Sequence, residues 1–292
     1  MKSVPCFFLL SAGLLLAGNT PARAEWFADL AAGTRYDSNL TAAQKRADIR
    51  ADIAATLTAT GGNFYALSGA DGLTLSVGAR SELYHRFHGL NETAIDASGV
   101  YKHKFGLGYA APWLSLGIFA SHENYTGNIR DSDRLEWRAE LGKRFSEAFD
   151  ASFGGMYARR YARHGEAVVP GISGKVFDVH GQTAFARAGY AISEQFQVGA
   201  RLSIRRGDVV STTRQNFEIF EASDAIAPDP TFGDDFFAYR LQGTTQTASL
   251  SLSWALSERA SLNLAYADER THAYEGLDYR GRVANVTLVY SY

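Results

Sequence analysis

The stretch from residue 47 to residue 59 reads ADIRADIAATLTA. Apolar side chains occupy every second position, among them Ile53 and Leu57, while polar ones such as Arg50 and Asp52 fill positions between them. Side chains of a β-strand alternate between the two faces of a sheet, whereas a helix repeats about every 3.6 residues. The stretch therefore predicts a strand with one apolar and one polar face.

The same alternation recurs along the chain, with no competing helical period. Leu202 and Ile204 face away from Arg201 and Ser203, for example. Such segments centre near residues 31, 53, 79, 98, 117, 139, 155, 184, 201, 248, 265 and 286. We therefore predict twelve strands. The alternatives are ten and fourteen, since outer-membrane barrels have an even number of strands.

Connections of two kinds alternate between these segments. The short ones lie near 68–72, 106–112, 146–149, 193–195 and 257–260, and three of them begin with Ser-Glu. The longer, more polar ones lie near 37–46, 86–92, 124–133, 164–174, 207–236 and 272–279. Short turns on one side and long loops on the other are typical of outer-membrane barrels, in which the turns are periplasmic.

Strand length and chemistry favour a membrane barrel over a soluble β-sandwich. Many segments approach the roughly 9–11 residues that a tilted strand needs to cross a bilayer. Aromatic residues gather at the expected strand ends, where they would form the two interfacial girdles. They are Trp26, Tyr36, Tyr65, Tyr84, Tyr101, Phe105, Trp113, Tyr125, Phe145, Tyr190 and Trp254. The sequence thus predicts an all-β fold, a transmembrane antiparallel up-and-down β-barrel.

The first 24 residues read as a secretory signal peptide. Lys2 precedes an apolar run over 4–17 that is too short to span a bilayer, and Ala22-Arg23-Ala24 is a small-x-small cleavage site. We therefore expect residues 1–24 to be the signal and residues 25–292 to be the barrel. Cys6 is the one cysteine of the chain, so the barrel region offers no thiol for catalysis or metal binding. With 29 basic and 31 acidic residues, the charge gives no nucleic-acid footprint.

Two short segments resemble known outer-membrane proteins. Residues 33–39, GTRYDSN, resemble the Gly-x-x-Tyr-Asp-Ser-Asn start of proteobacterial porin-like barrels and of the barrel half of surface-lipoprotein assembly modifiers. The sequence contains no helical-repeat segment such as the modifiers carry. The alternating ending Leu288, Tyr290 and Tyr292 resembles the signal by which barrels are recognised for insertion. These resemblances imply outer-membrane lipid and the insertion machinery as partners.

The polar face of the strands is the candidate functional site, because it would line the lumen. Arginines outnumber carboxylates in this reading, which predicts a positive lumen and a path for small polar or anionic solutes. A lumen plugged by paired charges is the alternative. The residues expected to set selectivity are Arg50, Arg80, Arg134, Glu136, Arg138, Glu140, Arg201 and Arg205.

The connection over 207–236 stands out by its length and acidity. Long loops are uncommon unless they have a function. We predict that this one folds inward against the basic wall and constricts the lumen; a mobile external loop is the alternative. Its acidic residues are Asp208, Glu218, Glu221, Asp224, Asp229, Asp234 and Asp235.

Other functions receive less support from the sequence. A barrel that does not conduct but serves as an export or assembly partner is the first alternative. A hydrolase at the rim is the second, because six histidines fall near the long loops; their spacing forms no ligand motif, and His122-Glu123-Asn124 lacks the serine of a phospholipase His-x-Ser pairing. We expect no enzymatic activity, cofactor or metal, and the sequence leaves the oligomeric state open. The rim histidines are His85, His88, His122, His164, His180 and His272.

Overall fold

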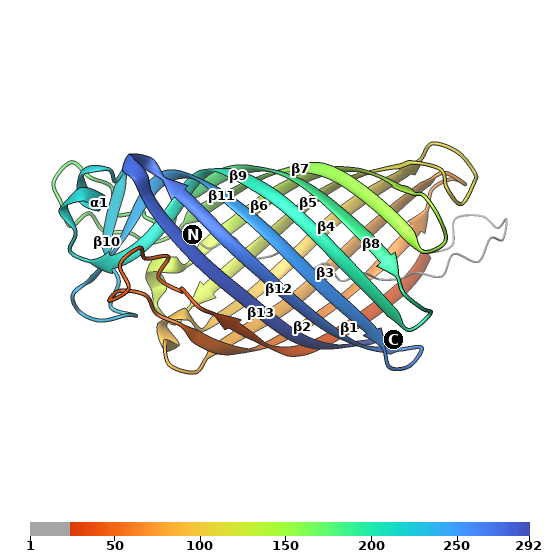
Figure 1. Ribbon diagram of the computed structural model, residues 1–292, viewed down its shortest axis with the longest axis horizontal. Coiled ribbons are helices and arrows are strands. Elements are labelled where there is room, and N and C mark those ends of the chain that lie inside the picture. Colours follow the sequence, from red (N-terminus) through yellow and green to blue (C-terminus); the bar gives the residue numbers. More distant parts are fainter. Residues whose placement is uncertain (1–23) are drawn as a thin grey trace.

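The computed structural model describes residues 24–292 as a closed antiparallel β-barrel (Figure 1). The predicted signal peptide lies almost entirely outside the described residues. The barrel strands are β1 (Ala24–Asp37), β2 (Asp52–Ala66), β3 (Asp71–Tyr84), β4 (Glu92–Lys104), β5 (Trp113–Tyr125), β6 (Ser132–Arg144), β7 (Phe149–Ala162), β8 (Val179–Ala191), β9 (Phe196–Arg214), β11 (Phe236–Ala255), β12 (Ala260–Ala273) and β13 (Leu277–Ser291).

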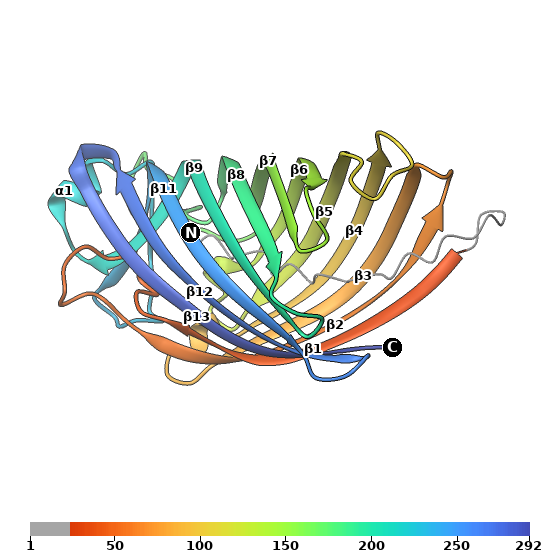
Figure 2. The same cartoon turned by 45° about the vertical axis from the view of Figure 1, so that its right-hand side comes forward.

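Each barrel strand pairs with its neighbours in the chain, and β1 pairs with β13 to close the ring. The prediction of a twelve-stranded up-and-down barrel is thus confirmed, and Figure 2 shows the strongly tilted strands. Closure leaves no unpaired sheet edge, which lipid could not satisfy. A short further strand, β10 (Ala225–Pro228), pairs with β11 where β11 extends past β12. Among the described residues no helix is long and apolar enough to span a bilayer.

Most connections alternate as predicted, which gives the barrel a short-turn end and a long-loop end. The exception is the predicted long loop over 272–279, because β12 and β13 continue to Ala273 and from Leu277 and leave only residues 274–276 between them. Serine shapes the short turns: the hydroxyls of Ser146, Ser193 and Ser257 each accept a hydrogen bond from the backbone N–H three residues later. In this pattern, a serine turn, the side chain forms the hydrogen bond that closes the turn. By the usual orientation of such barrels, the long-loop end is external.

Outward positions carry apolar side chains that no protein atoms cover. Ile95, Leu202 and Leu250 are each about two-thirds exposed, at 67%, 65% and 65%. A soluble protein rarely exposes so broad an apolar surface. An apolar belt around a closed barrel is the surface that lipid covers, which makes this chain an outer-membrane barrel.

Two expectations were wrong, one about where a strand begins and one about which face some aromatic side chains occupy. The strand predicted over 47–59 begins only at Asp52, so residues 47–51, including Arg50, belong to the first long loop. Tyr84, Trp113 and Tyr125 are not part of a lipid-facing girdle, because each shares the inward phase of its strand. The phase of the alternation gives this face, since Tyr84 is in phase with Arg80 and Glu82, whereas a position at a strand end does not.

Inward aromatic rings lie flat against glycines of the barrel wall. A Cβ atom on Gly117 would lie 2.7 Å from the ring of Phe119, and one on Gly142 would lie 2.2 Å from the ring of Trp113. Glycine therefore provides the space that lets these rings follow the wall.

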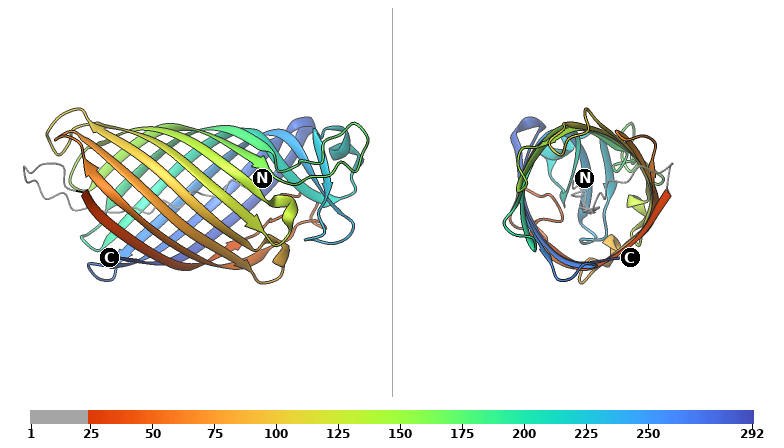
Figure 3. Two further views of the ribbon diagram at one scale, coloured as in Figure 1. Left: turned by 180° about the vertical axis from the view of Figure 1, so that it is seen from behind. Right: turned by 90° about the vertical axis from the view of Figure 1, so that its right-hand side faces the viewer.

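The long-loop end carries a compact cap, residues 207–236, formed by the extensions of β9 and β11 with β10 and α1 (Phe217–Glu221). In a ring of twelve strands, β3 and β4 lie opposite β9 and β11. The cap reaches that opposite side: the rings of Phe232 and Phe87 are 5.0 Å apart, and Phe232 is buried with Leu90. The end-on view in Figure 3 places the cap strands within the outline of the ring.

Candidate functional site

The inner wall divides into two arcs of different chemistry. Strands β3 to β8 carry most of its charged side chains. Strands β9 and β11 to β13 present mainly small hydroxyl and amide side chains instead. The neutral arc includes Ser203, Thr245, Thr247, Ser249, Ser251, Ser253, Ser261, Asn263, Thr271, Asn285 and Thr287.

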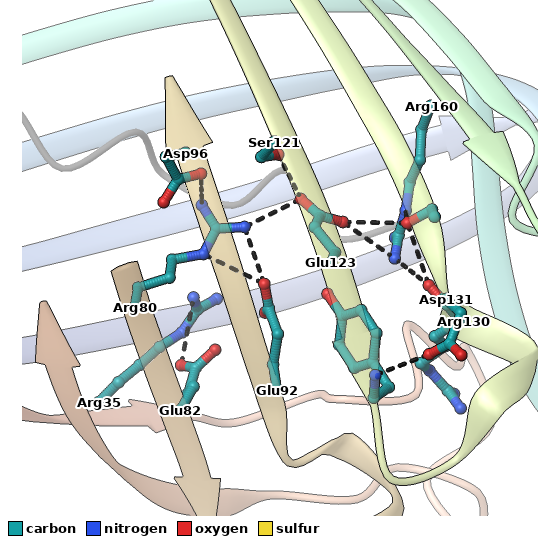
Figure 4. Close-up of polar contacts among 12 residues, drawn as sticks. Arg35, Arg80, Glu82, Glu92, Asp96, Ser121, Glu123, Arg130, Asp131 and Arg160 are labelled. Atoms are coloured by element: carbon teal, nitrogen blue, oxygen red, sulfur yellow. Dashed lines mark hydrogen bonds and ion pairs between the residues drawn. The ribbon is translucent and has the colours of Figure 1, made fainter. Parts of the chain in front are cut away.

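Arg80 is the centre of the largest polar network on the charged arc (Figure 4). Its guanidinium lies 2.8 Å from Glu92, 3.2 Å from Asp96 and 2.9 Å from Glu123. These carboxylates come from β4 and β5, the next two strands of the sheet. The planar guanidinium presents five donors in a fixed fork, so it can hold several carboxylates at once.

Glu123 links this network to β7. Its second oxygen lies 3.2 Å from Arg160 and accepts a hydrogen bond from Ser132 at 3.1 Å. Arg160 also donates to Ser132 and to the carbonyl oxygen of Arg130, each at 2.6 Å. Figure 4 shows Glu123 between the two guanidinium groups of Arg80 and Arg160. Buried charges require such partners, since an isolated one is costly.

Two further ion-pair groups continue the charged arc toward the short-turn end. Glu136 lies between Arg134, at 2.7 Å, and Arg138, at 2.6 Å, all on β6. Glu140 is 2.7 Å from Arg187 and accepts a hydrogen bond from Ser152 at 2.6 Å.

Several inner cations also lie over aromatic rings. Arg138 lies 4.9 Å from the ring centre of Phe119, and Arg201 lies 4.4 Å from that of Phe185. A cation over a ring face is stabilised by the ring quadrupole. These stacks hold the guanidinium groups close to the wall.

The inner face has more acidic groups than the sequence indicated. Asp37, Glu92, Asp150 and Glu269 also share the inward phase of their strands. Their negative charges balance those of the inward arginines and lysines. The predicted excess of positive charge on the inner face of the strands is therefore wrong. The acids nearest the long-loop end are Asp37, Asp52, Glu82, Glu92, Glu123 and Glu269, and the cations nearest the short-turn end are Lys102, Lys104, Arg144 and Arg187. Toward the cap these acids lie beside the inward arginines Arg35, Arg80, Arg134, Arg160 and Arg205, so charges of both signs are mixed there.

A buried ion pair joins the cap to the opposite rim. Arg130, in the loop between β5 and β6, donates from Nη1 to Asp229 Oδ1 at 3.0 Å, and its Nη2 contacts Oδ2. Asp229 is fully buried and also accepts a hydrogen bond from Thr212 at 3.3 Å. The ring of Phe177 lies 4.8 Å from the Arg130 guanidinium. This pair had no signal in the sequence beyond its residue types.

The other acidic residues of the cap have different positions. Asp208 lies on β9 and accepts a hydrogen bond from the backbone N–H of His180 at 2.8 Å, so it belongs to the wall. Asp235 pairs with Arg214 at 2.6 Å, within the cap. The remaining four acidic residues are exposed: Glu218, Glu221, Asp224 and Asp234. Within residues 24–292, the cap meets the opposite side mainly through Asp229 and apolar side chains, instead of through an acidic surface on a basic wall.

Two predicted lumen arginines have mainly local partners. Arg50 lies 4.9 Å from the ring centre of Phe236 and donates to the carbonyl oxygen of Ala47 at 2.8 Å. Arg205 is inward and donates to the carbonyl oxygens of Asp208 and His180. The structure brings together Arg80 with Glu123, and Arg134 with Glu136 and Arg138, while Arg50 stays at the cap.

The rim histidines are dispersed around the long-loop end. His122 lies 2.7 Å from Asp133, His180 lies 2.8 Å from Asp208, and His272 lies 2.5 Å from Asp278. Within residues 24–292, no group of three or more acidic, histidine or cysteine side chains is placed to hold a metal ion. The structure therefore does not gather these histidines into one centre.

The predicted insertion signal lies on β13 and just beyond it. Leu288 and Tyr290 point outward, with exposures of 47% and 46%. The ring of Tyr292 lies 5.2 Å from that of Trp26 at the short-turn end. Recognition by insertion machinery stays a prediction.

Solved structures share this fold. An outer membrane channel from Pseudomonas putida F1 aligns over 94% of this chain and 97% of its own, with a TM-score of 0.59 and 10% identity. The NanC porin aligns over 89% of this chain and 98% of its own, with a TM-score of 0.49 and 10% identity. The sequence matches no protein-family model and no curated protein. The first of these alignments indicates that the chain has the fold of an outer-membrane channel.

Proposed function

We propose that this chain is a passive outer-membrane channel for small polar solutes, anions among them. The observation that supports it is the direction of the ion pairs on the inner wall. Arg80 pairs with β4 and β5, Arg160 with β5, and Arg187 with β6. Each partner is at most two strands away, so these pairs run along the wall instead of bridging the lumen. Paired charges and hydroxyls can then line a water-filled path.

Solute contacts in this proposal differ between the two arcs. Arg138 and Arg201, held over aromatic rings, would offer donors to an anion inside the barrel. Serine and threonine of the opposite arc would form hydrogen bonds with solute hydroxyls. Selectivity in this proposal is set by Arg80, Arg134, Glu136, Arg138, Glu140, Arg201 and Arg205.

The cap, in the same proposal, constricts the external mouth. It spans from β9 and β11 to the loop between β3 and β4, and the Arg130–Asp229 pair fastens it. Polar solutes would pass between the cap and the ion-paired part of the wall. The proposal involves transport without catalysis.

Single-channel conductance tests the proposal. Refolded residues 25–292 are inserted into a planar bilayer, and selectivity is measured from the reversal potential under a salt gradient. We expect discrete steps of stable conductance, and liposome swelling with small neutral and anionic sugars. A folded barrel that neither conducts nor admits any of these solutes would overturn the proposal.

A further inference from the structure

The outer face of the barrel carries an apolar groove that the channel proposal does not use. Its volume is about 1030 Å³ and it crosses the outer face from β3 to β9. A volume of this size is in the range of small-molecule sites. Most of its lining residues point outward, so it opens to the membrane and not to the lumen.

Strand register explains the course of the groove. Two rows of outward side chains follow the hydrogen-bonding direction and form its sides. The first row is Leu73, Tyr101, Leu116, Ala139, Gly155, Ala184 and Ile204, and the second is Leu75, Gly99, Ile118, Trp137, Tyr157, Gln182 and Arg206.

Small residues make the groove deep. Ala139, Gly155 and Ala184 are consecutive in the first row, so the backbone between the rows is left uncovered there. The rings of Trp137 and Tyr157, 5.8 Å apart, stand beside them as a rim. An extended hydrocarbon chain fits such a surface, because it gains contact with the floor and with the rim.

The end of the groove nearest the long loops is polar. Arg206 and Gln182 line it there, on β9 and β8. Within residues 24–292, Arg206 forms no ion pair or side-chain hydrogen bond. The outer face on the short-turn side of Arg206 is apolar. An exposed arginine at the upper end of an apolar groove complements a chain that ends in an anion.

We propose that this groove binds one phosphate-bearing anionic lipid of the outer leaflet. One acyl chain would lie along the two rows, across Ala139, Gly155 and Ala184. The phosphate would accept hydrogen bonds from Arg206, with Gln182 beside it. The inference rests on the outer surface alone and holds whether or not the lumen conducts.

Fluorescence of Trp137 tests the site directly. In a variant with Trp26, Trp113 and Trp254 replaced by phenylalanine, Trp137 is the remaining tryptophan. The refolded protein in detergent is titrated with phosphatidylglycerol or phosphatidylcholine carrying brominated acyl chains, which quench tryptophan on contact. We expect phosphatidylglycerol to bind about five- to tenfold more tightly, as one charge-assisted contact provides.

Two substitutions separate chain binding from headgroup binding. Arg206→Gln should abolish the preference for phosphatidylglycerol, while Gly155→Leu should fill the floor and reduce quenching by both lipids. Gly61→Leu on β2 is the matched control, since both glycines point outward and meet only one backbone oxygen, at 3.8 Å. Equal binding of the two lipids by the protein that keeps Arg206 and Gly155 would overturn the proposal. Unchanged quenching in Gly155→Leu would overturn it too. Native mass spectrometry that finds a protein dimer without bound lipid would also overturn the proposal.

Discussion

Arg130 and Asp229 form a buried ion pair although 99 residues separate them in the chain. Arg130 belongs to the loop after β5, and Asp229 belongs to the cap that extends from β9 and β11. The contact is bidentate, with one nitrogen of Arg130 on each oxygen of Asp229, and the rings of Phe177 and Phe232 lie over the guanidinium. Geometry of this kind holds two chain segments in one relative position.

Asp229→Asn should loosen the cap and raise single-channel conductance. The substitution leaves the buried Arg130 guanidinium without its counter-charge, and breaking a buried pair in this way costs about 3–5 kcal/mol. That cost falls on docking of the cap, since the barrel strands keep their own hydrogen bonds. The increase should be accompanied by faster tryptic cleavage at Arg214. Asp234→Asn, at an exposed position of the same cap, is the control and should match the unmodified protein. Equal conductance of the two variants would contradict a constricting cap.

Arg138→Gln combined with Arg201→Gln should shift ion selectivity toward cations. Both guanidinium groups lie on the inner face of the barrel, where a fixed charge acts on a passing ion. The reversal potential under a tenfold salt gradient measures the change. Arg159→Gln offers a control, because Arg159 points outward and pairs with Asp178 at 2.9 Å. An identical shift in the control would mean that the effect is not one of the lumen wall.

The fold was predictable because period-two alternation is a local property of the sequence. Leu135, Trp137 and Leu141 alternate with Arg134, Glu136 and Glu140, and the structure places the two sets on opposite faces. The partners of those charges were not predictable, since the contact of Arg80 with Glu123 depends on register over three strands. Alternation also continues into the loop at Arg50, where tertiary contacts end the strand. The groove depends on small residues of β6, β7 and β8, which align only when these three strands are in register.

Glu123→Gln should destabilise the barrel more than any exposed carboxyl substitution. Glu123 is 2% exposed and lies between the arginines of β3 and β7. Its loss leaves two cations close together with less compensation, which we expect to cost about 3 kcal/mol or more. Urea unfolding in lipid vesicles, followed by the loss of heat-resistant mobility on gels, measures this. Glu147→Gln, in an exposed short turn, is the control. A midpoint equal to that of the control would show that the network contributes little to stability.

Gly117→Ala should narrow the lumen without unfolding the barrel. The Phe119 ring lies against Gly117, and an added Cβ would meet that ring at 2.7 Å and 3.0 Å, with the Val100 side chain at 3.6 Å. Its near neighbours are side-chain atoms, so the ring can turn away from the wall, and the open direction is the lumen. The turn also moves the ring from beneath Arg138. We expect a lower conductance with near-unchanged thermal stability. Gly155→Ala, on the outer face of β7, adds the same methyl group where only one backbone oxygen lies nearby, at 3.8 Å. If both variants conduct like the unmodified protein, the ring at Phe119 does not border the conducting path.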